Sequence, residues 1–448
     1  MKLTVIGGGG FRIPQLFTAL GGDAAPITVT ELHLHDVQVE RLNTIRKILE
    51  HLAPDLPKAP KLSFSTDLDE AVTGADFIFS AMRIGGIDGR IADERTALDL
   101  GVLGQETVGP GGLAYAMRTL PVVTHLAERV RELAPNAWLI NFTNPAGLVT
   151  ETMRRILGDR VIGICDTPIG LMRRATRAAG GDPRTVEFDY VGINHLGWLR
   201  TLSVDGIDRL PEVLASDSAL AGIEEARLLG FDWVRTIGAL PNEYLYYYYF
   251  TREATERIRS SKETRGEFLK RQQGRFYADA LGLGPAATLE LWEETLRERE
   301  FTYMAESRAD DERDARLEED VEDGGYQKVA LELMTALSGG DTATMILNVG
   351  NRGNVPQLPD EAVIEVPCRV DADGVHPQRV APVAGDMLGL MRQVKAAEQL
   401  TLEASITRSA ELAWRGLAAH PLVDSVAVAK QLLDGYRDRI PGVAAAFD

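Results

Sequence analysis

The chain opens with a short apolar strand that runs directly into a cluster of glycines. The strand is LTVI at residues 3–6, and a helix can begin near Pro14, because proline in the first helical turn loses no hydrogen bond. Glycines between strand and helix let the backbone approach a pyrophosphate, which the positive end of the helix dipole then stabilises. The glycines are Gly7, Gly8, Gly9 and Gly10. This order predicts a dinucleotide-binding βαβ unit.

The same alternation of strand and helix continues over about the first 190 residues. Amphipathic helices are expected over residues 37–52 and 113–133. Apolar, β-branched runs between such helices predict repeated βαβ units and a parallel sheet. The expected strands cover residues 3–6, 30–35, 61–65, 76–82, 137–142 and 161–164.

The second expected strand ends at an acidic residue, Asp36. A carboxylate in this position accepts a hydrogen bond from a ribose 2′-hydroxyl and favours NAD over NADP. Two simpler interpretations stay open: the glycines form a plain connecting turn, and Asp36 caps the following helix. The combination of glycines, helix and acidic residue favours the NAD site.

The pattern changes after Gly192, where longer helical stretches begin. Helices are expected over residues 223–237 and 261–279, and a strand over residues 362–374 precedes a helical C-terminus. The acidic run at residues 309–323 is interpreted as a solvated surface stretch.

A chain of 448 residues exceeds the usual size of a single core, so two domains are expected. We predict an α/β protein with a Rossmann-type parallel sheet and NAD site over residues 1–192. Residues 193–448 are predicted to form a mainly helical α+β domain for substrate, metal and oligomer contacts. The active site is expected in the crevice between the two.

Composition narrows the class of partner. The net charge of −18 disfavours nucleic acid, although a few arginines suffice to reverse the sign inside one cleft. Two cysteines provide no disulfide framework and favour a reducing compartment. The N-terminus lacks the pattern of a signal peptide, and no apolar stretch is long enough to span a bilayer. We therefore expect a cytoplasmic protein with no membrane partner.

Cys165 and His195 form a candidate metal site. Cys165 follows an expected strand in GICDTPIG, just before a helix near Pro168, where the helix dipole stabilises a thiolate. His195 follows another strand in GINHLGW and provides a second ligand as a neutral imidazole. Two protein ligands leave positions open for substrate. From these residues alone, packing roles for both side chains remain the alternative.

Several ordered blocks together closely resemble glycoside hydrolase family 4, and most nearly its 6-phospho-β-glucosidases. The resemblance covers essentially the whole chain. It implies a Rossmann domain like that of lactate and malate dehydrogenases, tightly held NAD, and a divalent metal, usually manganese, on Cys165 and His195. A cysteine ligand by itself would favour zinc. The blocks are RIGGIDGR (83–90), GQETVGPGGLAYAMR (104–118), NFTNPAGLVTE (141–151), GICDTPIG, GINHLGW, PNEYLYYYY (241–249), TRGE (264–267) and residues 348–374.

The resemblance also implies a reaction mechanism. NAD-dependent glycosidases do not use the two-carboxylate mechanism of most glycosidases. NAD removes hydride from C3 of the sugar, which makes the C2 proton acidic, and the metal stabilises the enolate. A base takes the C2 proton, the aglycone leaves C1, water adds, and C3 is reduced again. The implied substrate is a phosphorylated disaccharide or an aryl glucoside 6-phosphate, and the sugar product is glucose 6-phosphate.

Individual roles follow from the same resemblance. Tyr244 matches the base, since a nearby divalent cation lowers the pKa of a phenol. Most of its tyrosine neighbours must be packing residues. Asp166 matches the general acid of the α-specific members, and a helix cap is its alternative. The expected cofactor contacts are Gly7, Gly8, Gly9, Gly10, Asp36, Arg83, Glu106 and Asn144, and the expected substrate contacts are Arg90, Asn144 and Arg265. For each arginine, a surface ion pair is the alternative.

The chain departs from the family pattern at two positions. Gly10 stands where the family usually has serine, so one phosphate contact is lost. Asp166 is typical of 6-phospho-α-glucosidases, whereas NHLGW and the later blocks are more typical of β-specific members. A 6-phospho-α-glucosidase therefore remains the alternative activity.

Two further alternatives lie outside the hydrolases. They are a dehydrogenase of a hydroxy acid or sugar acid, and a nucleotide-sensing protein without catalysis. Relatives form dimers or tetramers, so a homo-oligomer is expected. Cys368 is interpreted as a core residue.

Overall fold

The computed structural model describes residues 1–302 and 325–447. Within these residues, 13 strands form one mixed sheet in the order β10-β8-β7-β12-β11-β6-β5-β4-β1-β2-β3, with β9 on β8 and β13 on β12. The strands are β1 (Lys2–Ile6), β2 (Glu31–His35), β3 (Lys61–Ser65), β4 (Phe77–Ser80), β5 (Trp138–Asn141), β6 (Val161–Gly163), β7 (Glu187–Ile193), β8 (Leu196–Val204), β9 (Ile207–Asp208), β10 (Leu240–Pro241), β11 (Ala343–Gly350), β12 (Val363–Asp371) and β13 (Gly374–Pro377).

One half of the sheet is parallel and confirms all six expected strands. Strands β3, β2, β1, β4, β5 and β6 pair in parallel, which is the 3-2-1-4-5-6 order of a Rossmann fold. All four residues of β4 are buried, because helices cover both faces of a parallel sheet. The carboxyl ends of β1 and β4 therefore define a crevice beside the glycine loop.

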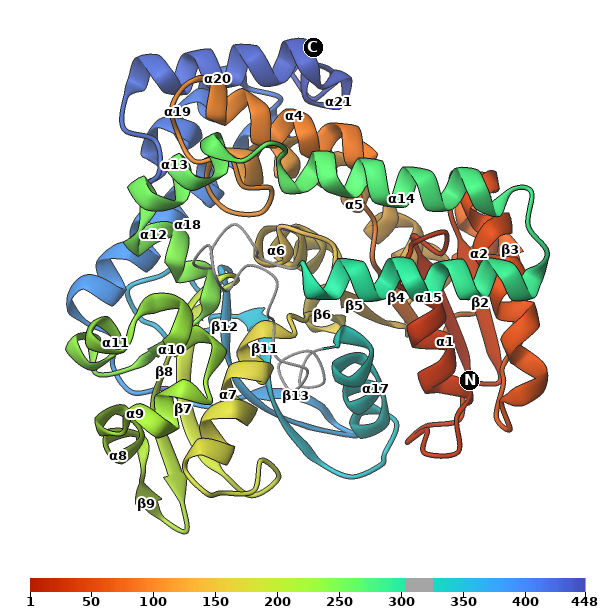
Figure 1. Cartoon of the computed structure of the whole chain (residues 1–448), viewed down its shortest axis with the longest axis horizontal. Helices are drawn as coiled ribbons and strands as arrows, with labels where there is room; N and C mark the ends of the chain where they lie inside the picture. Colours follow the sequence, from red (N-terminus) through yellow and green to blue (C-terminus); the bar gives the residue numbers. More distant parts are fainter. Residues whose placement is uncertain (303–324, 448) are drawn as a thin grey trace.

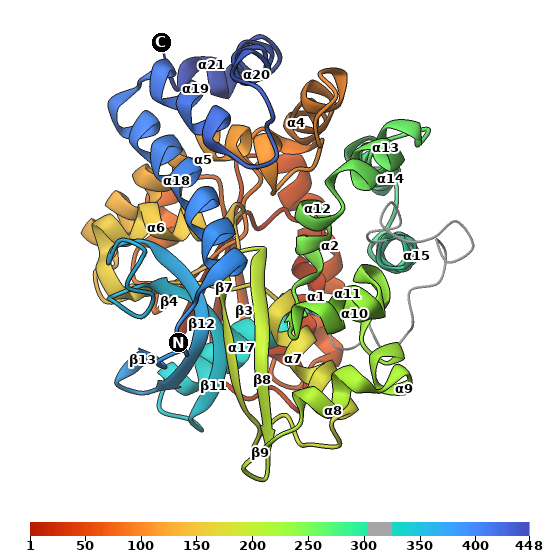
Figure 2. The same ribbon diagram turned by 90° about the vertical axis from the view of Figure 1, so that its left-hand side faces the viewer.

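The other half is antiparallel and continues the same sheet. β11 joins β6 through the pair Asn348 and Gly163, and β12, β7, β8 and β10 follow. Residues 362–374, expected as one strand, form β12 and the first residue of the hairpin partner β13. In Figure 2, β7 and β8 stand at the centre, with α6 and α18 to their left and α7 to their right.

The helices form layers on the sheet and a cap beside it (Figure 1). The long pair α14 and α15 comes from the second half of the chain, yet it packs against α4 and α2 of the first half. No helix in the described ranges is both long and apolar enough to cross a membrane. The helices are α1 (Ile13–Gly21), α2 (Val39–Leu52), α3 (Leu68–Val72), α4 (Gly86–Asp99), α5 (Gly109–Leu133), α6 (Ala146–Leu157), α7 (Thr167–Ala178), α8 (Leu210–Ala215), α9 (Asp217–Ala221), α10 (Glu224–Leu229), α11 (Phe231–Ile237), α12 (Tyr246–Tyr249), α13 (Thr251–Ser260), α14 (Arg265–Ala280), α15 (Pro285–Phe301), α17 (Tyr326–Leu337), α18 (Gly385–Thr407), α19 (Ala410–Ala419), α20 (Val426–Arg439) and α21 (Pro441–Ala445), with short 3₁₀ turns η1 (Ala53–Asp55), η2 (Gly158–Arg160) and η3 (Glu243–Leu245).

Two expected helices differ from those observed. The single helix expected over 223–237 is wrong, because Gly230 has a φ of 85° and separates α10 from α11. The helix expected from residue 261 begins at Arg265, where Thr264 and Glu267 form a capping box. The acidic run expected on the surface, residues 309–323, lies outside the described residues.

Candidate functional site

The glycine loop passes very close to two neighbouring strands. Gly7 has a φ of 96°, and a Cβ there would lie 2.5 Å from the carbonyl oxygen of Ala81, just after β4. A Cβ on Gly8 would lie 2.7 Å from Cβ of Leu34 in β2. Larger residues would force the loop away from the sheet, so the glycines bring the backbone to the crevice.

The backbone N–H groups of this loop point mostly inward. Gly7 and Gly8 donate to the carbonyl of His35, at 2.9 and 2.7 Å, and Gly10 donates to Gly7 at 3.0 Å. Among the described residues, the N–H groups of Phe11 and Arg12 have no acceptor. They stand at the start of α1, where the helix dipole favours an anion, so this end of the loop fits a pyrophosphate.

Asp36 fastens the loop to the end of β2. Its Oδ2 accepts from the N–H of Gly9 at 3.0 Å, and its Oδ1 accepts from the N–H of Gln38 at 2.9 Å. Gln38 occupies the N-cap position of α2, so Asp36 is not the cap residue. A carboxylate keeps acceptor capacity beyond these two bonds, which fits a ribose hydroxyl. Tyr277 of α14, absent from the sequence interpretation, donates to the carbonyl of Gly9 at 2.8 Å.

A cavity of about 420 Å³ opens beside the glycine loop. It collects side chains from the parallel strands, the antiparallel strands and α15, and Arg12, Arg299 and Glu300 also line it. Seven of the residues singled out from the sequence lie on its wall: Arg83, Glu106, Asn144, Cys165, Asp166, His195 and Tyr244.

Cys165 and Tyr244 are linked through two polar side chains that sequence reasoning missed. The Sγ of Cys165 lies 3.4 Å from the Oγ1 of Thr167, and Asn242 donates to that same Oγ1 at 2.8 Å. Asn242 also accepts from the N–H of Tyr244 at 3.0 Å. The only signal was the position of Asn242 inside the PNEYL block. These bonds fix the position of the loop that carries Cys165 relative to the segment that carries Tyr244.

His195 is buried and adopts a left-handed backbone conformation, with a φ of 63°. Its Nδ1 is buried and has no hydrogen-bond partner within residues 1–302 and 325–447. Burial lowers the pKa of His195 to about 3, although Glu106 opposes the shift. The imidazole is therefore neutral at pH 7 and carries an unused nitrogen, as a metal ligand requires.

Cys165 is buried close to two carboxylates that disfavour its ionisation. Burial raises the pKa of Cys165 well above its usual value, and Glu365 and Asp166 raise it further. Burial thus opposes the stabilisation of a thiolate that the dipole of α7 provides. A cation on this sulfur would displace a proton.

The donor set fits an open metal site. In the part of the chain that the structure describes, no group of three or more His, Cys, Asp and Glu side chains could hold a metal. Cys165 and His195 lie on the same cavity. Two donors from the chain would leave the remaining positions to substrate oxygens and water.

Glu106 lies between two arginines. It forms an ion pair with Arg83 and a second ion pair with Arg90, whose Nη1 lies 2.7 Å from Oε1 of Glu106. Burial opposes ionisation, yet Arg83 and Arg90 lower the pKa of Glu106 to about 2. Arg90 also donates to Glu94 at 2.7 Å. Glu106 is thus a permanent anion on the cavity wall.

Arg90 and Arg265 lie on a neighbouring cavity of about 280 Å³, not on the one that holds Cys165. Arg265 donates from Nη1 to the carbonyl of Thr302 at 3.0 Å and from Nη2 to that of Arg299 at 3.0 Å. Asn144 lines the larger cavity, and the two cavities adjoin, because Arg90 contacts Glu106 and Arg265 contacts Arg299 on its wall.

Asp166 occupies the N-cap position of α7, but its side chain makes no capping hydrogen bond. It lines the larger cavity. Its alternative role as a helix cap is not supported by this geometry, and its carboxylate is available to a ligand.

The fold, the glycine loop and this cavity define a Rossmann-type α/β protein in which Cys165 and His195 form a candidate two-donor metal site. Residues 2–180 match the Family 4 glycosyl hydrolase domain, and residues 190–423 match the Family 4 glycosyl hydrolase C-terminal domain. The chain belongs to glycosyl hydrolase family 4. This membership confirms the resemblance and disfavours the dehydrogenase and the nucleotide sensor.

Relatives in the family carry both anomeric names. A probable 6-phospho-β-glucosidase of Bacillus subtilis is 29% identical, with 97% of this chain and 95% of that protein aligned. A 6-phospho-α-glucosidase of Lacticaseibacillus paracasei is also 29% identical, over 97% of this chain and 96% of that protein. The 6-phospho-β-glucosidase of Thermotoga maritima, solved with manganese, NAD⁺ and glucose 6-phosphate, superposes with a TM-score of 0.80. It is 27% identical over 98% of both chains.

Proposed function

We propose that this chain hydrolyses 6-phosphorylated glucosides, with a preference for the β anomer, and that it uses NAD and manganese. One observation carries the proposal: Cys165, His195 and Tyr244 line a single cavity beside the glycine loop. That arrangement brings a metal-ligand pair and a phenol to the crevice where a dinucleotide binds. The Thermotoga relative with all three ligands supports it.

The glycine loop and Asp36 would hold NAD, and Cys165 and His195 would hold manganese. When bound, the dinucleotide would supply reversible hydride transfer at C3 of the sugar, and manganese would supply Lewis-acid polarisation of the neighbouring oxygens. The remaining chemistry belongs to side chains of this chain.

Tyr244 is assigned as the base that takes the C2 proton. Its ring is held against His195, so its position relative to the cation site is defined. Asn144 and Arg83 are assigned to ligand contacts on the same wall, and the carboxylate of Glu106 holds Arg83 in place. Fixed charged groups in a partly closed cavity act on a substrate without reorganising.

The α-specific activity is the second candidate, because of Asp166. Its carboxylate lines the cavity and caps nothing, so it is placed to protonate a leaving group. A β-specific reaction does not need that acid when the aglycone is a good leaving group.

The test uses reduced protein with NAD⁺ and Mn²⁺ and three p-nitrophenyl glucosides: the β anomer 6-phosphate, the α anomer 6-phosphate, and the unphosphorylated β-glucoside. Nitrophenol release from the phosphorylated β compound alone, abolished by EDTA, supports the proposal. Release from the α compound alone moves the assignment to the second candidate. If none of the three compounds releases nitrophenol, both candidate activities are contradicted.

A further inference from the structure

Two arginines on the cavity wall differ from the others in their partners. The other two, Arg83 and Arg174, are paired with Glu106 and Glu225. Arg12 and Arg299 make no ion pair with any residue of the described ranges, and the Nε of Arg12 is buried with no hydrogen-bond partner there. A buried guanidinium nitrogen without an acceptor is costly, so a ligand that accepts is favoured.

Arg12 and Arg299 come from distant parts of the chain and line the same cavity. Arg12 precedes α1, and its guanidinium carbon lies 5.8 Å from the ring centroid of Tyr326. Arg299 lies in the last turn of α15, with its guanidinium carbon 6.0 Å from the ring centroid of Phe11. The aromatic rings hold both side chains in place. The cavity also carries Glu300, which accepts from Gln15 at 3.3 Å.

Arg299 interacts with several other guanidinium groups, while the carboxylate of Glu106 places an opposite charge in the same cavity. Burial and the guanidinium groups of Arg12, Arg265, Arg83 and Arg90 lower the pKa of Arg299 well below its usual value. An arginine stays protonated in proteins, so this cost is relieved by an anion bound beside it. The chain as a whole carries a charge of −18, so its surface repels anions in general. The arginines of the cavity therefore attract an anion at this place only.

We propose that Arg12 and Arg299 form a subsite for a phosphoryl group on the cavity wall where the start of α1 meets the end of α15. Two guanidinium groups present several donors in planar arrays, which match phosphate oxygens. The inference deepens the proposed function and rests on it for the identity of the ligand. A phosphoryl group can come from the sugar phosphate or from the pyrophosphate of the dinucleotide.

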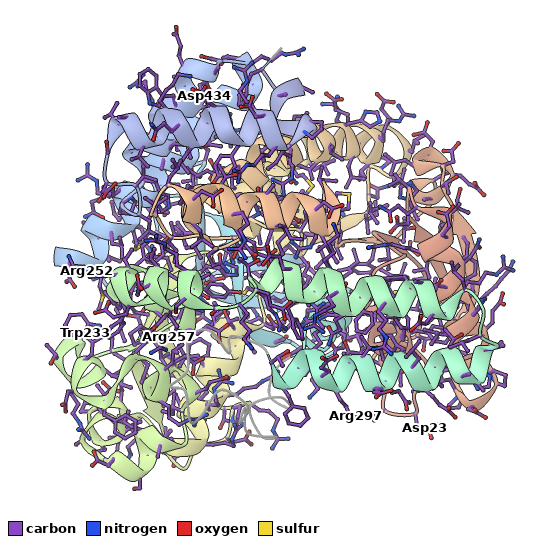
Figure 3. All side chains as sticks on the ribbon, turned by 45° about the horizontal axis from the view of Figure 1, so that its top comes forward. Asp23, Trp233, Arg252, Arg257, Arg297 and Asp434 are labelled. Atoms are coloured by element: carbon purple, nitrogen blue, oxygen red, sulfur yellow. The ribbon has the colours of Figure 1, made fainter. Side chains whose placement is uncertain are left out.

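The test compares R12Q and R299Q with R297Q. Arg297 is exposed on α15 and labelled at the outer edge of that helix in Figure 3, so R297Q removes one charge from the same helix without touching the cavity. Kd values are measured by calorimetry for glucose 6-phosphate and for NAD⁺. Losing one charge-assisted bond weakens binding about 10- to 100-fold.

A higher Kd for glucose 6-phosphate, with NAD⁺ unchanged, assigns the subsite to the sugar phosphate. A higher Kd for NAD⁺ alone assigns it to the pyrophosphate. R12K and R299K keep the charge and should recover part of the affinity. Without ligand, R299Q should not lower the Tm, because it removes repulsion, and inorganic phosphate should raise the Tm of the unaltered protein more than that of R299Q.

The subsite is wrong if R12Q and R299Q bind both ligands as tightly as R297Q does. In that case nitrophenol release from the phosphorylated glucoside still decides the proposed function. An unaltered protein that releases no nitrophenol contradicts the proposed function, whatever the arginine variants bind.

Discussion

The imidazole of His195 and the phenol ring of Tyr244 lie face to face, with 3.7 Å between centroids and 5° between planes. The two residues are far apart in the sequence and come from the β7–β8 turn and the η3 turn. Stacking fixes the distance from the candidate base to one candidate metal ligand. A cation on His195 would therefore act on the tyrosine at a constant separation.

Replacing Tyr244 by phenylalanine should keep the stack and remove the proton acceptor. We expect Y244F to lower kcat at least about 100-fold, since positioned general bases contribute on that order. Binding of NAD⁺ should stay within about twofold of the unaltered protein, as the ring is preserved. Y248F is the matched control, because it removes a phenol from the same tyrosine run, outside the cavity. Equal losses in both variants would contradict the role of Tyr244.

Manganese binding should depend on one of the two cysteines. We expect C165S to lose Mn²⁺ binding by at least about tenfold, because a serine hydroxyl is a poor ligand for a divalent cation beside a single imidazole. C368S makes the same exchange at a buried position in β12 and should retain binding. The concentration of free Mn²⁺ is measured by electron paramagnetic resonance. Retained binding in C165S would remove Cys165 from the metal site.

Asp36 should set the preference for NAD over NADP. D36N keeps an acceptor for one backbone N–H but loses the negative charge that repels a 2′-phosphate. We expect NAD⁺ to bind about tenfold more weakly and the NAD/NADP selectivity to fall by more than that. Calorimetric titration with both dinucleotides measures the ratio. An unchanged ratio would place the ribose elsewhere.

The buried pair of Asp93 and Arg118 should be needed for stability. Asp93 accepts two bonds from Arg118, at 2.8 and 2.6 Å, and both side chains are 1% exposed. D93N leaves the arginine charge buried without its partner, so we expect a loss of about 3–5 kcal/mol in the free energy of unfolding. E50Q breaks the exposed pair with Arg46 and should cost at most about 1 kcal/mol. Urea unfolding compares the two.

His420 should make the protein sensitive to acid. Burial lowers the pKa of His420 to about 3, so the folded protein keeps it neutral while the unfolded chain binds a proton below the usual value of 6.5. Stability from this residue is complete above about pH 6.5 and is lost as pH falls toward 3.

H420N tests this because an asparagine oxygen can replace the Nδ1 that accepts from the N–H of Leu422 at 3.2 Å. Between pH 7 and pH 5, urea unfolding should show the unaltered protein losing about 2 kcal/mol more than H420N. Parallel losses in the two proteins would mean that His420 does not stay neutral.

Local patterns in the sequence predicted the parallel half of the sheet well. Strand runs such as residues 137–142 and 161–164 are short, mostly apolar and bounded by turn residues, so their type follows from neighbours in the chain. The glycine loop and Asp36 were also predictable, because strand, turn and acid are contiguous in sequence. The family blocks then indicated Tyr244, and they favoured the metal site at Cys165 and His195 over packing roles for those two residues.

The antiparallel half was not predictable in the same way. β11 and β12 extend the sheet by pairing with β6 and β7, and such long-range pairing leaves no local signal in the chain. The interruption between helices α10 and α11 at Gly230 depends on one backbone angle, which a helical pattern in the sequence does not reveal.

The sequence by itself determined the class of fold, the dinucleotide loop and the residue types of the candidate centre, since these follow from contiguous segments. Only the tertiary structure decided which side chains share the cavity. Arg12 and Arg299 line the same cavity because α14 and α15 pack against helices of the first half of the chain, whereas Arg90 is paired with Glu94 and Glu106. The physical reason is that the partners of a charge depend on packing between distant segments, and burial then decides whether that charge stays paired or awaits a ligand.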